Sequence, residues 1–128
     1  MLNIESKVES LRLVEKFVDD ISNELKLSNE IYGNLLIALL EAANNAIVHG
    51  NKLDGSKKVN IEVIKDKDLL EIIITDQGLG FDYNNVPDPT APENIEKITG
   101  RGIFLMKKLS DKIEFYEDGT VVKLIFNT

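Results

Sequence analysis

Two long segments in the first half of the chain carry apolar residues at helical spacing. In residues 5–25 an apolar residue recurs about every third or fourth position, which predicts an amphipathic helix. Ser28, a residue type favoured at helix N-caps, precedes a second apolar run that predicts a helix to about His49. Gly50 and Asn51 follow as residues that stop this second helix.

The second half of the chain alternates in the manner of strands. Polar residues separate Val59, Ile61 and Val63, which predicts a strand with one buried face. Residues 69–75 are a β-branched run typical of a buried strand, and residues 112–116 and 120–126 predict a hairpin. Helices followed by such strands indicate an α+β protein: a two-layer α/β sandwich with a mixed, mostly antiparallel sheet and helices on one face. At 128 residues, we expect a single domain over residues 1–128.

Composition narrows the classes of function. The 22 acidic and 15 basic residues give a net charge of −7, which argues against nucleic acid as a partner. The absence of cysteine excludes a disulfide framework, a cysteine nucleophile and a zinc–thiolate site, and the single histidine, His49, cannot form a histidine-rich metal site. The start of the chain lacks a signal-peptide pattern, and no apolar stretch approaches the ~20 residues that span a bilayer. We therefore expect a cytoplasmic protein without a membrane segment.

Glu41 and Asn45 place two polar groups in the otherwise apolar second helix. Their four-residue offset puts both side chains on the same helix face. A carboxylate can accept a proton from a hydroxyl group or water, and an amide oxygen can bind a hard cation such as Mg²⁺. Taken alone, the pair is equally typical of a solvated helix face.

Two glycine clusters follow in the second half of the chain. Asp76 closes the strand over residues 69–75, where its carboxylate can accept from a purine amine, and Gly78 and Gly80 let a flat ligand approach the backbone. The second cluster, residues 99–102, directly precedes an amphipathic helix predicted from residue 103. Free N–H groups and the helix dipole make such a start an anion site. Each cluster alone is also explained by an ordinary turn or a glycine-capped loop.

Residues 82–99, between the two glycine clusters, show no periodicity and contain all three prolines. Loops of this length inside compact domains are uncommon and are usually lids or binding segments. We predict that this segment is a lid over a ligand. A surface loop without a ligand is the alternative.

Together, and in this order, the three elements resemble the GHKL ATP-binding (Bergerat) fold of gyrase and the histidine kinases. The closest resemblance is to the bacterial anti-sigma factor serine/threonine-protein kinases. Residues 41–51 resemble the N box, residues 76–82 the G1 box and residues 100–106 the G2 box, while Thr120 resembles a threonine that helps to hold adenine. The resemblance runs from about residue 11 to residue 126 and implies ATP and Mg²⁺ as cofactors.

Individual residues acquire expected roles from this resemblance and from their chemistry. Glu41 is the expected catalytic base, since a serine hydroxyl or a water needs help in losing its proton, and Asn45 is the expected Mg²⁺ ligand. Lys97 is either a contact to the terminal phosphate or a solvated lysine. His49 either bonds the last carbonyls of its helix or contacts a phosphate. The residues expected to contact the nucleotide are Asn45, Asp76, Gly78, Gly80, Lys97, Gly100, Arg101, Gly102 and Thr120.

The resemblance also implies partners. The expected phosphate acceptor is a serine or threonine of an anti-anti-sigma antagonist, and a sigma factor is the competing partner of an ATP-bound homodimer. Arg12 matches a basic residue of the shared partner surface, or is an ordinary exposed arginine. A nucleotide-gated binding module that transfers no phosphate remains an alternative, as does an ATPase fragment like that of gyrase. The presence of Glu41 favours an enzyme that transfers phosphate over a module that only binds the nucleotide.

Overall fold

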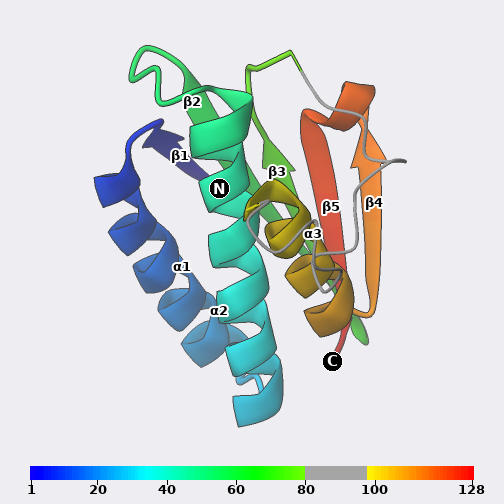
Figure 1. Cartoon of the computed structure of the whole chain (residues 1–128). Helices are drawn as coiled ribbons and strands as arrows, with labels where there is room; N and C mark the ends of the chain where they lie inside the picture. The colour runs from blue at the N-terminus through cyan, green and yellow to red at the C-terminus, as the bar shows by residue number, and fades with distance from the viewer. Residues whose placement is uncertain (80–97) are drawn as a thin grey trace.

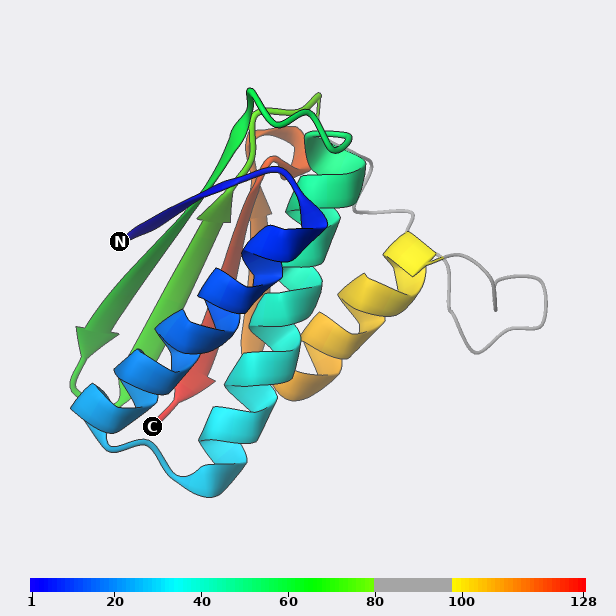
Figure 2. The ribbon, with the colours of Figure 1, turned by 90° about the vertical axis from the view of Figure 1, so that its left-hand side faces the viewer.

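The computed structural model describes residues 1–79 and 98–128. One five-stranded sheet, in the order β1-β2-β3-β5-β4, carries the three α-helices on one face (Figure 1; Figure 2). This confirms the predicted α+β sandwich, although every pair of neighbouring strands is antiparallel rather than part of a mixed sheet. The strands are β1 (Leu2–Glu5), β2 (Lys58–Asp66), β3 (Leu69–Thr75), β4 (Lys112–Tyr116) and β5 (Val121–Asn127). The helices are α1 (Leu11–Leu25), α2 (Asn29–Asn44) and α3 (Ile98–Leu109), with shorter turns η1 (Val8–Ser10), η2 (Asn45–Gly50) and η5 (Glu117–Gly119).

The core lies between the helices and the facing side of the sheet. Successive strand residues point to opposite faces, so every second residue of β2 and β3 lies under the helices, in β2 as the alternation predicted. Leu70, Ile72 and Ile74 of β3 are buried in this way, and Leu35 and Leu39 of α2 are fully buried opposite the sheet. The α2 helix is therefore held in place along its length, which matters because it carries Glu41 and leads directly into Asn45.

The start of α2 follows its sequence signal. Ser28 is the N-cap, and its hydroxyl oxygen accepts a hydrogen bond from the Ile31 N–H at 3.2 Å. A serine in this role satisfies one of the N–H groups that lack an intrahelical acceptor. At the other end the helix continues past Asn44 as the π-helical turn η2, which ends at Gly50 as predicted.

The N-terminal segment corrects one sequence prediction. The first helix begins at Leu11 rather than at residue 5, because residues Leu2–Glu5 form the edge strand β1. Ile4 is 1% exposed and lies opposite Val59 of β2. A strand of four residues is too short to show an alternating pattern, so its identity depends on pairing with a distant segment.

The second glycine cluster corrects another boundary. The α3 helix begins at Ile98, not at residue 103, so Gly100 and Gly102 lie inside its first turns and the predicted 82–99 loop ends earlier. Glycine lowers intrinsic helix propensity, but tertiary packing against α2 overrides it here. The predicted lid, together with Gly80 and Lys97, lies outside the described residues and remains a prediction.

The continuous helix Asn29–Gly50 is long and apolar enough to cross a membrane by length and composition alone, contrary to the expectation from sequence. A helix that fills a protein core meets the same two criteria. Here Leu35, Ala38 and Leu39 are fully buried in the core that faces the sheet. Internal packing therefore accounts for part of its apolar character.

The structure has room for a side chain at Gly33. It lies within α2, and a Cβ added there meets no atom within 4 Å. We expect Gly33→Ala to raise the free energy of unfolding by about 0.5–1 kcal/mol, because alanine loses less backbone entropy in a helix. Urea unfolding measures this change. Gly78→Ala is the contrasting variant, since its Cβ would lie 2.1 Å from the Gly50 carbonyl oxygen and should destabilise. A loss of stability in Gly33→Ala would contradict the open space around this residue.

Candidate functional site

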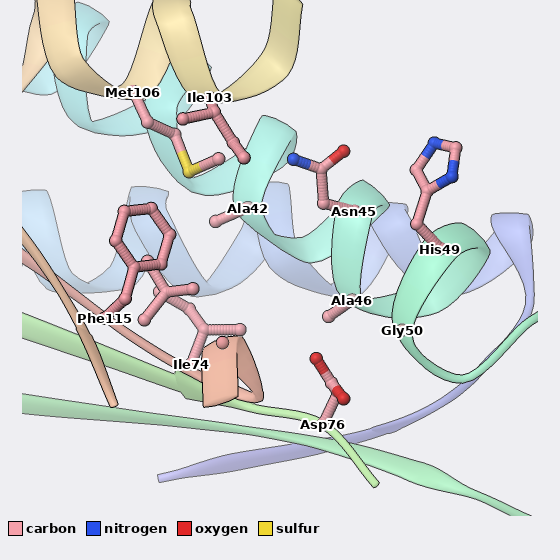
Figure 3. A pocket seen from close by; sticks show the side chains of 12 residues that line it. Ala42, Asn45, Ala46, His49, Gly50, Ile74, Asp76, Ile103, Met106 and Phe115 are labelled. Atoms are coloured by element: carbon pink, nitrogen blue, oxygen red, sulfur yellow. The ribbon is translucent and has the colours of Figure 1, made fainter. Parts of the chain in front are cut away.

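A cavity lies between the C-terminal part of α2, the turn η2, α3 and the sheet (Figure 3). Its polar lining consists of Asn45, His49 and Asp76, while its apolar walls include Ile74, Ile103, Met106 and Phe115. Apolar walls with a few polar groups are typical of sites for flat organic ligands. None of the apolar residues stood out in the sequence, because each also fits a core position.

Glu41 and Asn45 lie on the same side of the helix, as their spacing predicted, and both side chains face Gly102 of α3. A Cβ built on Gly102 would lie 3.1 Å from Glu41 Oε2 and 3.2 Å from Asn45 Oδ1. Gly102 is buried, so its lack of a side chain lets the first turns of α3 approach these two polar groups closely. The structure thus brings the first and third motifs together at one point.

Asn45 carries an unusual buried acceptor. Its Oδ1 atom is buried and has no hydrogen-bond partner among the described residues. Buried polar atoms are nearly always paired, so an orphaned amide oxygen on a residue that lines the cavity is available to a ligand atom. Mg²⁺ prefers oxygen ligands and keeps waters and phosphates in the rest of its shell. Asn45 therefore fits the predicted magnesium ligand.

Asp76 sits at the end of β3, where the chain passes very close to the end of the N box. A Cβ on Gly50 would lie 2.6 Å from the Asp76 carboxylate, and one on Gly78 would lie 2.1 Å from the Gly50 carbonyl oxygen. Both glycines are needed for this close approach. The N–H of Gly78 donates to Asp76 Oδ1 at 2.8 Å, whereas no described group hydrogen-bonds Oδ2. One carboxylate oxygen is thus held by the backbone and the other remains for a ligand.

The charge of Asp76 is costly to the fold. Burial raises the pKa of this carboxyl above its ordinary value, and the Gly78 N–H and the Lys57 charge oppose the rise only in part. Because the folded-state pKa is raised, the ionised group destabilises the fold at neutral pH, and this cost disappears as the pH falls through the raised pKa. A carboxyl group whose pKa is raised by burial beside a cavity is typical of a functional site.

His49 is exposed and lines the cavity one turn after Asn45 (Figure 3). Partial burial of its ring, followed by the nearby charge of Lys52, lowers the pKa of this imidazole, so the neutral form prevails at pH 7. In the described part of the chain its ring makes no hydrogen bond to the helix carbonyls, so helix capping is not supported there. The alternative contact to a ligand remains a prediction.

Thr120 and the start of α3 complete the predicted set. The Thr120 carbonyl accepts from the Asp76 N–H at 2.9 Å, so Thr120 lies beside Asp76, while its hydroxyl donates to the Glu117 carbonyl at 2.8 Å. In a helix that begins at Ile98, the first four N–H groups lack intrahelical acceptors, and these include Gly100 and Arg101. The corrected helix start therefore places N–H groups that lack intrahelical acceptors on residues before Gly102.

The sequence indicates Asn51 only as a helix stop and does not predict its buried side-chain hydrogen bonds. It is 1% exposed, and its side chain bonds the backbone directly after Asp76. A polar residue at a predicted helix end is usually exposed, so nothing local in the sequence distinguishes a buried one.

Comparisons with known proteins agree with this geometry. The family model of the histidine kinase-like ATPase domain matches residues 4–126. Serine-protein kinase RsbW of Halalkalibacterium halodurans is 30% identical over 127 residues, which cover 94% of this chain and 77% of that protein. Serine-protein kinase RsbW of Bacillus licheniformis is 30% identical over 122 residues, covering 91% and 76% of the two chains. The corresponding kinase of Listeria monocytogenes is 28% identical over 123 residues, covering 91% and 78%. The resemblance inferred from the three motifs is confirmed, and the chain belongs to the histidine kinase-like ATPase family.

Proposed function

We propose that this protein is an ATP-dependent serine/threonine-protein kinase that acts as an anti-sigma factor in a partner-switching pathway. The observation that carries the proposal is the position of Glu41 beside Asn45, with both side chains facing the start of α3 at Gly102. Several relatives bear the name of serine-protein kinases, which supports the same chemistry. We also propose that residues 1–128 act as one nucleotide-binding domain, in keeping with the family match over residues 4–126.

Each end of the nucleotide has its own group of residues. Asp76, with Gly78 and Thr120 beside it, binds the adenine amine through the carboxylate oxygen that the backbone leaves unbonded. The free N–H groups at the start of α3, including those of Gly100 and Arg101, face the phosphates. Gly80 and Lys97 belong to the proposed site through the family resemblance, Lys97 as a contact to the terminal phosphate.

Asn45 holds Mg²⁺ through its buried Oδ1 atom. When bound, the ion neutralises developing charge on the phosphates and aligns them. Glu41, one helical turn away, acts on the acceptor. The carboxylate takes the proton from a serine or threonine hydroxyl as that oxygen bonds to the terminal phosphorus, and ADP leaves with the bridging oxygen. The half-buried position of Glu41 limits competing access of water.

The proposed partners follow from this reaction. An anti-anti-sigma antagonist supplies the hydroxyl, and a sigma factor competes for an ATP-bound homodimer of this chain in the cytoplasm. Arg12 is exposed on α1, where a partner can reach it. Phosphorylation adds negative charge to the antagonist, so it no longer displaces the sigma factor from this acidic protein.

The test is a transfer assay with the purified protein, ATP, Mg²⁺ and the antagonist encoded beside its gene. We expect one serine or threonine of the antagonist to become phosphorylated, and its replacement by alanine to abolish the signal. ATP-dependent binding of the antagonist without any transfer would instead support the nucleotide-gated binding module. Absence of ATP binding would overturn both functions.

Asp76→Asn tests adenine recognition. Asparagine presents an amine where the adenine amine requires an acceptor, so we expect ATP affinity to fall about ten- to a hundred-fold, the loss of a charge-assisted hydrogen bond. The same change removes a partly buried charge, so the ligand-free protein should become no less stable. Calorimetry and thermal unfolding measure the two effects. Asp54→Asn, in an exposed loop, is the matched control and should leave affinity unchanged. Unchanged affinity in Asp76→Asn would remove Asp76 from the site.

A further inference from the structure

Asn51 is a buried amide whose hydrogen-bonding groups are all used. It is 1% exposed and lies where the chain leaves η2. Its Oδ1 atom accepts from the Gln77 N–H at 2.7 Å, and its Nδ2 group donates to Ser6 Oγ at 2.8 Å and to the Lys58 carbonyl at 3.1 Å. These contacts join Asn51 to three other parts of the chain, of which Ser6 and Gln77 are distant from it in sequence. A fully satisfied buried amide of this kind holds its neighbours in one geometry.

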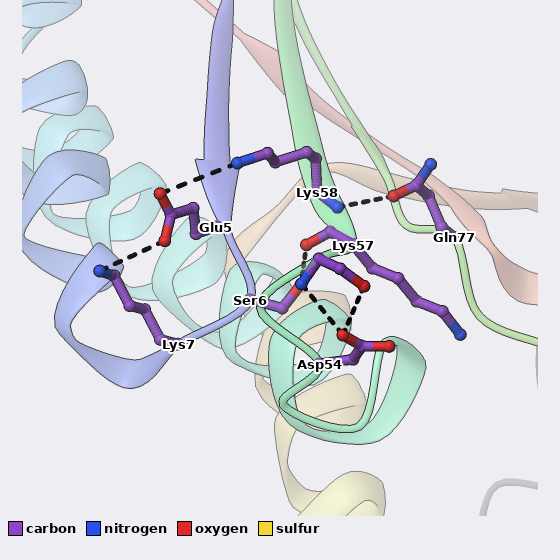
Figure 4. Close-up of polar contacts among 8 residues, drawn as sticks. Glu5, Ser6, Lys7, Asp54, Lys57, Lys58 and Gln77 are labelled. Carbon is purple, nitrogen blue, oxygen red and sulfur yellow. Dashed lines mark hydrogen bonds and ion pairs between the residues drawn. The ribbon is translucent and has the colours of Figure 1, made fainter.

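The Asp76 loop is one of the segments that Asn51 holds. Three successive N–H groups of this loop are bonded: Asp76 to the Thr120 carbonyl at 2.9 Å, Gln77 to Asn51, and Gly78 to the Asp76 carboxylate at 2.8 Å. The Gln77 side chain also accepts from the Lys58 N–H at 2.6 Å (Figure 4). Of these bonds, the one that the Gln77 N–H donates to Asn51 ties the loop directly to the end of the N box.

Asn51 also holds the end of β1, through Ser6. Ser6, directly after β1, is fully buried, and its hydroxyl donates to the Lys57 carbonyl at 2.7 Å while accepting from Asn51. The preceding residue, Glu5, forms ion pairs with Lys7 at 3.3 Å and with Lys58 at 3.8 Å (Figure 4). Those two ion pairs are exposed and contribute little, so the buried hydroxyl is the main polar anchor of this junction.

We propose that Asn51 is a positioning residue for adenine recognition, and that Ser6 completes its function by fixing the orientation of the Asn51 amide. This inference rests on the proposed nucleotide site. Asn51 does not touch the nucleotide; it holds the backbone that aims the Asp76 carboxylate. The Ser6 hydroxyl and the Lys58 carbonyl take both amide hydrogens, which keeps Oδ1 directed at Gln77.

Base selectivity is the property that this arrangement controls. Adenine presents an amine to Asp76, whereas guanine presents a carbonyl oxygen at the same place, which the carboxylate repels. A loosened Asp76 loop therefore loses affinity for ATP while affinity for GTP changes little. Glu41 lies on α2, outside this network, so the rate of transfer at saturating ATP should not change.

Ser6→Ala and Asn51→Ala test the proposal. We expect the affinity for ATP to fall about three- to ten-fold in Ser6→Ala and about ten- to a hundred-fold in Asn51→Ala, because buried polar groups lose their partners. The ratio of ATP to GTP affinity should fall by a similar factor, and KM for ATP should rise with kcat unchanged. Ser110→Ala is the matched control, since this buried hydroxyl donates to the Met106 carbonyl far from the Asp76 loop.

Thermal unfolding establishes that each variant is folded at the assay temperature. Should Asn51→Ala not fold, Ser6→Ala provides the test, because it removes the hydroxyl that orients the Asn51 amide. A wild-type ratio of ATP to GTP affinity in the folded variants, or the same change in Ser110→Ala, would overturn the positioning role alone. Failure of the wild-type protein to bind ATP would overturn the proposed function itself.

Discussion

Replacing Glu41 with glutamine is expected to lower phosphoryl transfer by about 10²–10⁴-fold, the usual contribution of a general base. The change keeps the size of the side chain beside Gly102 and removes only its ability to accept the proton of the hydroxyl. ATP affinity should therefore remain close to the wild-type value. Single-turnover transfer to the antagonist and calorimetry with ATP measure the two quantities.

Glu30→Gln is the control for this result. Glu30 lies in the first turn of the same helix and is exposed, so the variant makes the same chemical change far from the cavity. It should transfer at the wild-type rate. An unchanged rate in Glu41→Gln would mean that another group accepts the proton, and equal losses in ATP affinity and transfer would assign Glu41 to binding.

The second large effect is expected for Asn45→Ala, on Mg²⁺-dependent ATP affinity and on phosphoryl transfer. Removal of the buried Oδ1 should abolish the gain in ATP affinity that Mg²⁺ provides and slow transfer by about 10²-fold or more, because a catalytic cation contributes several kcal/mol to the transition state. ATP affinity measured with Mg²⁺ and with a chelator gives the ratio to compare. The ratio should approach one in the variant.

The unfolding temperature of Asn45→Ala shows whether the variant has lost a magnesium ligand or its fold. The Asn45 oxygen has no hydrogen-bond partner in the described structure, so its deletion breaks no internal bond, and alanine favours the helix. We expect Asn45→Ala to unfold at the wild-type temperature or above. Asn44→Ala, one residue earlier in the same helix, should keep the Mg²⁺ effect. Lost Mg²⁺ dependence in both variants would indicate disturbance of the helix end rather than removal of a ligand.

The two predictions depend on one contact between distant segments. Gly102 brings α3 against Glu41 and Asn45, and the distances from its added Cβ to these side chains, 3.0 to 3.2 Å, leave little space for a larger residue. The proposed base and the proposed magnesium ligand thus meet the start of α3 at a single glycine. This geometry explains why a glycine inside a helix is useful despite its cost to helix stability.

Much of this protein was determined by short-range sequence pattern. The spacing of apolar residues predicted α2, and Ser28 predicted its start. The alternation in residues 59–63 and the β-branched run in residues 69–75 predicted two strands. The offset between Glu41 and Asn45 placed them on one face without further information, because helical geometry alone relates residues one turn apart. The motifs and their order were likewise sufficient to indicate the family.

Tertiary structure decided what depends on distant partners. The β1 strand exists because Ile4 pairs with β2, and α3 begins at Ile98 because packing against α2 outweighs its glycines. The contact between Gly50 and Asp76 and the bonds of Asn51 with Ser6 and Gln77 join segments that are far apart in the chain. Local propensity carries no information on such contacts, since their free energy arises only when the chain has folded and brought both partners out of water.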